Sequence, residues 1–296
     1  MSTTPNFAGN FLSNASPFVS NFPAIASPWG SFVKPGGRVA AYVRSTGAQD
    51  GEDHFAASGL LVASINEGLK RCRSGQNDIV FVLPGHTETY SATGAVWANL
   101  VAGAQIIGCG SAGATNAPTL NLTHAGASIA LNVANVTVAG LNIVGGVATA
   151  TASIVITAAG VVLAGNFLNF GGFALGANSP IAVTGAATCS IVGNNIVADS
   201  TATMIAITGA ASTNFLVQGN IARQAQATSG GGFSSTANTA GISGHYSDNY
   251  FKTATTSVGG AGVIVLGAAT ITTVGNHQNY GGEETAAASL LVTGAA

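Results

Sequence analysis

Charged side chains are scarce in this sequence. Lysine and arginine number 8 and aspartate and glutamate number 10, so charged residues are 6 % of the 296 residues, against about 25 % in an average globular protein. The formal net charge is −2 and no run of basic residues occurs. Proteins that bind nucleic acid neutralise phosphates with clustered lysine and arginine. The composition therefore predicts no nucleic-acid partner.

The few charges are also unevenly placed. Twelve of the 18 lie at or before Glu88, and the next charged residue is Asp199. Surfaces normally carry charge for solubility, so over this span threonine, serine, asparagine and glycine must replace it or the surface must face another molecule. The uncharged window 147–165 is rich in β-branched residues and threonine, which favours two strands and a turn over a membrane span. No signal peptide is expected at MSTTPNFAGN.

Cysteine is scarce as well. The three residues Cys72, Cys109 and Cys189 are an odd and widely spaced set, which excludes a disulfide framework and a zinc site. We expect small buried apolar side chains, consistent with synthesis in a reducing cytoplasm. The five histidines form no pair at helical spacing. Neither a metal nor a cofactor is predicted.

Helical periodicity is missing after residue 140, and a repeat takes its place. A two-residue turn recurs with spacings of 25, 28, 26, 29 and 27 residues, at Gly140-Leu141, Gly165-Asn166, Gly193-Asn194, Gly219-Asn220, Asp248-Asn249 and Gly275-Asn276. A second register of short β-branched segments runs in step with it, at 128–132, 153–157, 180–184, 204–208, 263–267 and 290–294. Each repeat unit therefore carries at least two short strands.

This repeat predicts an all-β fold, a single-stranded parallel β-helix of about eight coils of about 27 residues over 79–296. Glycine tolerates the positive φ that a sharp bend requires. The asparagines after the bend should stack as a ladder of amide hydrogen bonds, at Asn166, Asn194, Asn220, Asn249 and Asn276. A β-sandwich with Asn-Gly hairpins would explain single turns, but it does not explain a period near 27.

Residues 1–40 do not share the repeat. Their aromatic residues are Phe7, Phe11, Phe18, Phe22 and Trp29. Three interspersed prolines argue against a continuous helix. We expect an extended N-terminal anchoring arm whose aromatic side chains bind a surface, either on a partner or back on its own solenoid.

Residues 41–78 are expected to cap the first coil. AYVRSTG predicts a short strand, and Leu61, Ile65, Leu69 and Cys72 have the spacing of an amphipathic helix with Gly75 as its C-cap. A solenoid needs such a cover over its open end.

A family resemblance rests on STGAQDGED, INEGLKRC and VFVLPGHTETY. Together with the coil period, these segments resemble the start of right-handed parallel β-helix proteins of the pectate-lyase-like group. The resemblance implies a right-handed coil. It does not imply one activity, because phage tail and capsid proteins, adhesins and polysaccharide enzymes share the fold.

The leading expectation is a non-enzymatic structural protein of a virus particle, a bacteriophage capsid decoration or cement protein. It resembles phage virion β-helix proteins in its cap motif, its coil period and its scarcity of acids. Its partner would be the major capsid protein or another virion protein, with a homo-oligomer possible and no membrane. It would be made in the host cytoplasm and located on the capsid surface.

Two alternatives are open. A carbohydrate-binding or polysaccharide-degrading, tailspike-like enzyme would place Asp199, Arg223 and Asp248 along one groove, with Lys252 stacked on Arg223. An ice- or surface-binding solenoid would use a column of threonines, Thr157, Thr184 and Thr208.

Overall fold

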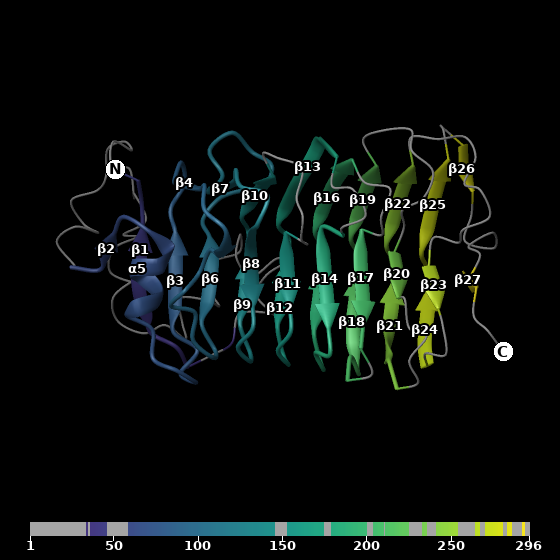
Figure 1. Ribbon diagram of the computed structural model, residues 1–296, viewed down its shortest axis with the longest axis horizontal. Coiled ribbons are helices and arrows are strands. Elements are labelled where there is room, and N and C mark those ends of the chain that lie inside the picture. The colour runs from purple at the N-terminus through teal and green to yellow at the C-terminus, as the bar shows by residue number, and fades with distance from the viewer. Residues whose placement is uncertain are drawn as a thin grey trace, which may run out of the picture.

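The computed structural model describes residues 34, 36–45, 59–145, 153–174, 179–199, 204–209, 211–224, 233–235, 241–253, 264–266, 270–280, 283–285 and 292–293. Within them the chain forms a parallel β-solenoid (Figure 1), which confirms the predicted all-β fold class. About five turns, residues 79–214, are described with only short gaps, fewer than the eight coils that the sequence predicts. Beyond them, shorter described strands extend the same three sheets.

Three sheets form the walls of the solenoid. Sheet A has ten strands in the order β2 (Leu61–Val62), β1 (Val39–Val43), β3 (Ile79–Val82), β6 (Gln105–Gly108), β9 (Thr137–Ala139), β12 (Val162–Ala164), β15 (Ser190–Val192), β18 (Phe215–Gln218), β21 (Ser243–Ser247) and β24 (Thr270–Val274). Sheet B has nine strands in the order β26 (Glu283–Thr285), β25 (His277–Tyr280), β22 (Tyr250–Thr253), β19 (Ile221–Gln224), β16 (Asn195–Asp199), β13 (Phe167–Ala174), β10 (Asn142–Gly145), β7 (Thr119–Leu122) and β4 (Thr87–Tyr90).

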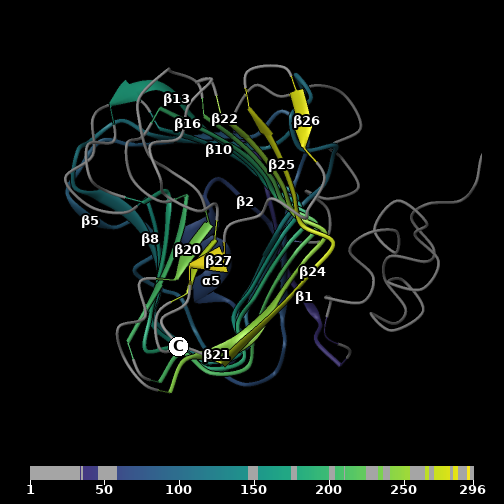
Figure 2. The same cartoon turned by 90° about the vertical axis from the view of Figure 1, so that its right-hand side faces the viewer.

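Sheet C is the third wall. Its eight strands are β27 (Val292–Thr293), β23 (Ile264–Leu266), β20 (Phe233–Ser235), β17 (Ile205–Thr208), β14 (Ile181–Thr184), β11 (Ile154–Ile156), β8 (Ala127–Leu131) and β5 (Gly94–Ala95). The predicted second register of β-branched segments is therefore this sheet. Seen from the C-terminal end (Figure 2), the chain passes counterclockwise from β24 to β25 and on to β27 while advancing toward the viewer, which makes the solenoid right-handed.

Strand pairing follows the repeat. Among the described strands, every ladder is parallel except that between β25 and β26. In sheet C, Ile154 pairs with Ile129 on one side and with Ile181 on the other, and Ile181 pairs with Ile205. Equivalent residues of successive coils thus lie directly above one another, which is the arrangement that the fixed period predicts.

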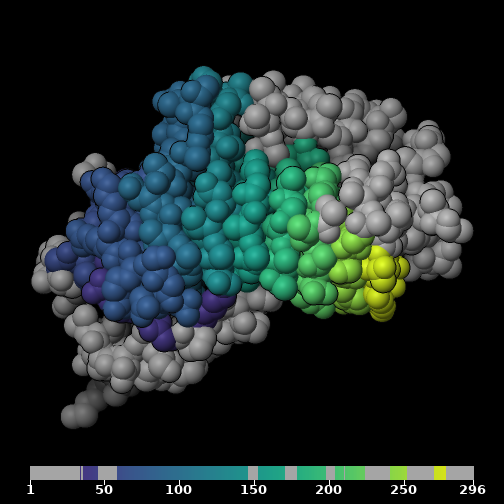
Figure 3. Space-filling view, turned by 60° about the horizontal axis from the view of Figure 1, so that its bottom comes forward, coloured from purple at the N-terminus to yellow at the C-terminus, as the bar shows by residue number. Residues whose placement is uncertain are grey.

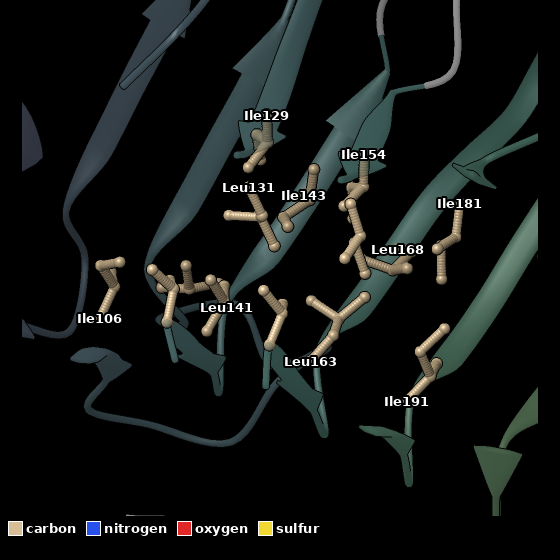
Figure 4. Close-up of a cluster of buried hydrophobic side chains, with 14 of the residues drawn as sticks. Ile106, Ile129, Leu131, Leu141, Ile143, Ile154, Leu163, Leu168, Ile181 and Ile191 are labelled. Atoms are coloured by element: carbon tan, nitrogen blue, oxygen red, sulfur yellow. The ribbon is translucent and has the colours of Figure 1, made fainter. Parts of the chain in front are cut away.

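The interior is a column of aliphatic side chains. Each inward strand position stacks on its equivalents, so that Ile129, Leu131, Ile143, Ile154 and Leu163 all point into one core (Figure 4). These five residues are at most 1 % exposed. Stacked β-branched and leucine side chains bury apolar area in every coil, at about 25 cal/mol per Å². The core therefore extends along the whole described solenoid.

A short helix closes the first coil. Helix α5 (Ile65–Lys70) begins after Ser64, whose side chain accepts a hydrogen bond from the Glu67 amide, as in a capping box. Ile65 and Leu69 are fully buried in the same core as the coils. A Cβ on Gly68 would lie 2.8 Å from Val80 Cγ1, so glycine allows the helix to pack closely on β1 and β3.

The predicted limits of this helix are wrong at both ends. Leu61 belongs to strand β2, because the cap at Ser64 starts the helix one turn later than the apolar spacing indicates. The C-cap is Arg71, not Gly75. Gly75 instead takes a φ of 75° in the following turn, where its amide donates to the Ala102 carbonyl.

Candidate functional site

The corner between sheets A and B carries the predicted asparagine ladder. Each asparagine donates from Nδ2 to Oδ1 of the next one along the solenoid, at 2.8–3.0 Å. All five are at most 3 % exposed: Asn166, Asn194, Asn220, Asn249 and Asn276. Figure 1 shows the strands of successive coils that this corner connects. The ladder is therefore confirmed as a buried structural feature.

The three middle amides of the ladder are fully used. In Asn220, Nδ2 donates to the Ile191 carbonyl at 2.8 Å and to Asn249 Oδ1 at 3.0 Å. Its Oδ1 accepts from both the backbone amide and Nδ2 of Asn194, each at 3.0 Å. Buried polar groups are costly unless they are hydrogen-bonded. This closed pattern explains why asparagine can be buried at the same corner in five successive coils.

The residue before each ladder position takes a left-handed conformation. φ lies between 50° and 72° at Gly140, Gly165, Gly193, Gly219, Asp248 and Gly275. Glycine accepts such angles without strain, and aspartate is among the few other residues that do so routinely. The predicted role of the Gly-Asn step is therefore confirmed. The ladder begins at Leu141, whose backbone amide donates to Asn166 Oδ1 at 3.1 Å.

A second left-handed column lies at the corner between sheets C and A, and sequence reasoning missed it. Its residues are Asn77, Gly103, Asn135, Gly160, Thr188 and Asn214, with φ between 53° and 79°. The amides of Gly103, Asn135, Gly160 and Thr188 donate to carbonyls of the next coil, as from Gly160 to Ala187 at 2.9 Å. The Asn214 amide donates instead to Ser243 Oγ at 3.1 Å. The residue type at this position changes from coil to coil among asparagine, glycine and threonine, so the sequence shows no repeated motif there.

A polar network around the buried side chain of His86 joins the cap to the first coil. Ser45 Oγ lies 3.2 Å from Nδ1 of His86, and His86 Nε2 lies 3.7 Å from Glu88 Oε1. The same Glu88 oxygen accepts from the Ile65 amide at 2.7 Å, at the first residue of α5. The other Glu88 oxygen accepts from the Tyr90 hydroxyl. Burial, and then the Glu88 carboxylate, raise the pKa of Tyr90.

Serine, histidine and glutamate in contact are the group types that hydrolases use for nucleophilic catalysis. Here Ser45 Oγ already accepts from the Thr87 amide at 2.9 Å, and His86 is fully buried. The network therefore positions α5 on strand β4. No local sequence pattern reveals this network, because Ser45 and His86 are 41 residues apart.

Asp78 makes a second junction between cap and coil. It is fully buried and accepts hydrogen bonds from the amides of Arg38 at 3.2 Å and Arg73 at 2.9 Å. The Arg73 guanidinium adds bonds at 2.8 and 3.0 Å. Burial alone would raise the pKa of Asp78, but these hydrogen bonds outweigh it and lower that pKa. The ion pair fixes the end of the cap against the start of β3.

The charged residues proposed for a polysaccharide site are spread over sheet B. Arg223 is exposed and is the Cα partner of Lys252, as the repeat predicts. Asp248 lies in the corner turn before β22, whereas Asp199 ends β16, six residues after the equivalent turn residue Gly193. Six residues of strand span about 20 Å. Glycosidase carboxyl pairs are about 5–9.5 Å apart, so this arrangement does not support such a pair.

The threonine column lies at the edge of sheet C. Thr184 and Thr208 are Cα partners with their hydroxyl oxygens 3.1 Å apart. Thr157 directly follows Ile156, whose partner Val183 directly precedes Thr184. The parallel outward column beside it is Val155, Ala182 and Ala206. A single threonine column beside an apolar one is not the regular threonine array that ice binding requires.

The outward face of sheet A is apolar at its N-terminal end. We call the cluster formed by Tyr42, Ile79, Phe81, Leu83, Ile107, Ala139, Val162 and Ala164 the outer patch. These side chains alternate along their strands with core side chains, and none is more than 9 % exposed. The rings of Tyr42 and Phe81 are stacked with centroids 5.9 Å apart. Cys109 packs against the patch, and burial raises the pKa of its thiol to about 12.

The predicted arm residues Phe7, Phe11, Phe18, Phe22 and Trp29 lie outside the described residues. Among the residues that are described, no cluster of three or more histidine, cysteine, aspartate or glutamate side chains could hold a metal ion. No helix in the described part has the length and apolar character needed to cross a membrane. All three cysteines are free, with Cys72 and Cys189 buried.

Comparison with known proteins identifies no relative. No family model, no curated protein and no solved structure matches the chain. The geometry of the solenoid and the chemistry of its walls therefore carry the functional argument.

Proposed function

We propose that this chain is a non-enzymatic structural protein of a virus particle, a bacteriophage capsid decoration or cement protein that binds the major capsid protein or another virion protein. The observation that carries the proposal is the outward face of sheet C. Its central column is Ala130, Val155, Ala182 and Ala206, all small or β-branched, aligned in register and half-buried. An uncharged row of this kind suits close packing against another protein.

The chemistry of protein interfaces supports this assignment. Interface cores are depleted in charged residues relative to the rest of a protein surface. Between Glu88 and Asp199 the chain has no charged residue, and this span supplies β8, β11 and β14 of sheet C. Figure 3 shows the described coils stacked side by side from the N-terminal to the C-terminal end. Equivalent positions of successive coils can thus contact a partner along one line.

Rigidity also suits a structural role. The ladder hydrogen-bonds each coil to the next through buried amides. This series of hydrogen bonds fixes the register of the sheets, because a shift in register would leave buried donors and acceptors without partners. In this proposal the aromatic residues of the N-terminal arm add the anchor, since aromatic side chains dominate the energetics of many interfaces.

The test is fractionation of particles from the native source, with the chain detected in each fraction. Sedimentation with capsids at a fixed stoichiometry is the expected result. For a purified system, Ala182→Arg places a charge in the centre of the sheet C wall and should abolish binding to particles. Ile221→Arg on sheet B, where Ile221 is already 37 % exposed, is the matched control and should still bind. A chain that never sediments with particles contradicts the proposal.

One observation favours the alternative, a carbohydrate-binding or polysaccharide-degrading solenoid. Arg223 and Lys252 are neighbours on adjacent strands of sheet B, and stacked cations suit an anionic polysaccharide. This alternative predicts that the chain binds acidic polysaccharides in a salt-sensitive manner and that Arg223→Ala weakens the binding. Binding that is unchanged in Arg223→Ala would remove this alternative.

A further inference from the structure

The outer patch is covered, although no described strand or helix lies over it. Ala139 is 1 % exposed and Ala164 is fully buried. Both belong to the patch and not to the core cluster. An alanine on the outward face of a sheet reaches such values only when other atoms pack directly on it. Helix α5 cannot supply them, because its buried side chains belong to the core inside the solenoid.

The chain before strand β1 begins on this same face. Gln105 is the outward residue at the start of β6, and its side chain holds the backbone of Lys34 from both sides. The Lys34 amide donates to Gln105 Oε1 at 2.7 Å, and Gln105 Nε2 donates to the Lys34 carbonyl at 3.1 Å. Gln105 is itself fully buried. Residue 34 is therefore fixed on the outside of sheet A, at the N-terminal end of β6.

The direction of the chain is also fixed there. Gly37 lies against Asn77, because a Cβ on it would be 1.6 Å from the Asn77 carbonyl oxygen. Three residues earlier the backbone has moved on by one coil, to Gln105. The Lys34 ammonium then reaches two coils further, donating to the carbonyls of Asn135 at 2.8 Å and Gly160 at 3.4 Å. The Lys34 side chain therefore points from the N-terminal end of β6 toward the N-terminal ends of β9 and β12.

We propose that residues 27–33, SPWGSFV, lie on the outer patch of their own chain, with Trp29 and Phe32 packed on it. Trp29 is five residues before Lys34, so it can lie up to about 17 Å from it. Strands β6 and β12 are two strand spacings, about 10 Å, apart. Ala139 and Ala164 leave room over β9 and β12 for aromatic rings, whereas the larger Tyr42 and Phe81 fill the face over β1 and β3.

The occupant is the same chain and not a second copy. A segment already fixed at Lys34 has a high effective concentration over the patch. This inference goes beyond the proposed function and does not rest on it. It divides the arm in two: residues 27–33 belong to the solenoid, and residues 1–26 with their four phenylalanines remain available for a partner.

The native cysteines supply the assay. In the full-length chain under native conditions, alkylation of each cysteine is followed by peptide mass spectrometry. We expect Trp29→Ala combined with Phe32→Ala to raise the alkylation rate of Cys109 by about tenfold or more, because its apolar cover is lost. Cys72 and Cys189 lie in the core and should be unchanged. The matched control, Phe7→Ala with Phe11→Ala, should leave all three rates unchanged. Equal Cys109 rates in the two variants overturn the proposal.

A second measurement does not depend on the double variant staying folded. The difference between the fluorescence of the wild-type chain and that of Trp29→Phe isolates the emission of Trp29. A blue-shifted, quencher-protected emission in a chain that light scattering shows to be monomeric is expected. Emission like that of free tryptophan overturns the packing of Trp29. Protection that appears only in a dimer overturns the assignment to the same chain.

Discussion

Removing one rung from the middle of the asparagine ladder should cost several kcal/mol. Asn220→Ala deletes two hydrogen bonds that Oδ1 accepts from Asn194, and three contacts that Nδ2 makes with Ile191, Gln218 and Asn249. Because Nδ2 carries two hydrogens, these three contacts are counted as two bonds, which gives four bonds in all. At a net worth of about 1 kcal/mol each, the loss is about 4 kcal/mol. The Asn194 backbone amide, which is buried, also loses its acceptor. No water can replace it in a site that is fully buried without opening the core.

The assay is urea unfolding followed by circular dichroism. The m value is compared between variants, because an unchanged m shows that the same surface is exposed on unfolding. Asn195→Ala is the matched control: it lies next to ladder residue Asn194, and its Oδ1 has no hydrogen-bond partner in the described part of the chain. We expect the control to stay within about 0.5 kcal/mol of the wild type. A loss below about 1 kcal/mol for Asn220→Ala, or one equal to the control, would refute the ladder as a major source of stability.

Three further predictions concern the corners, the cap and the buried thiols. Thr188 is β-branched at a φ of 55°, so Thr188→Gly should raise the unfolding free energy by about 1 kcal/mol, seen as a higher melting temperature. Asp78→Asn should lower the free energy of unfolding by about 2 kcal/mol at pH 7. Because the folded pKa of Asp78 lies below 3.8, this difference should shrink as the pH falls from 3.8 toward and through the folded pKa. A difference that does not shrink below pH 3.8 contradicts the ion pair. Burial raises the pKa of Cys72 from 9.0 to about 12 and that of Tyr42 from 10.0 to about 12. The contribution of these two groups to the free energy of unfolding is therefore fully present below pH 9 and is lost as the pH rises toward 12. We expect a lower urea midpoint at pH 10.5 than at pH 8.

The sequence predicts the A–B corner well because its chemistry permits few residues. A left-handed turn residue selects glycine, and a buried side chain that must donate twice and accept twice selects asparagine. Four coils therefore repeat Gly-Asn, and a fifth has Asp248-Asn249. At the C–A corner only the backbone conformation is constrained. Asparagine, glycine and even Thr188 satisfy it, so this column left no repeated signal.

The cap is predicted less well than the A–B corner. Apolar spacing located helix α5 but not its ends, because Leu61 continues the helical spacing while forming strand β2. The start is decided by the capping box at Ser64 and Glu67, which the sequence also contains. The contacts among Ser45, His86 and Glu88 depend on the tertiary fold alone, and no local pattern encodes them.

The outer patch did have a signal in the sequence. Strand β3 reads IVFV and continues into Leu83, with apolar residues on both faces. A strand that is apolar on both faces is typical of one that is covered on both sides. The run predicted a buried strand, but a solenoid wall has its core on one side only. We propose that the second cover comes from residues 27–33, because they directly precede Lys34, which is held on the same face of sheet A.

From β9 onward, the connection between sheets A and B has a constant length, whereas the connections at the other two corners vary. Between sheets A and B the connection is always two residues from β9 onward, as in Gly193-Asn194 between β15 and β16. Between sheets B and C it changes from five residues after β16 to ten after β22. The ladder explains the constant length of its corner, since an extra residue there would displace a buried amide from its hydrogen bonds. Insertions in repeat proteins gather on the face that tolerates them, which is often the binding face. The edge between sheets B and C borders the uncharged wall of sheet C, so the part of the solenoid that can vary lies beside the surface proposed to meet the particle.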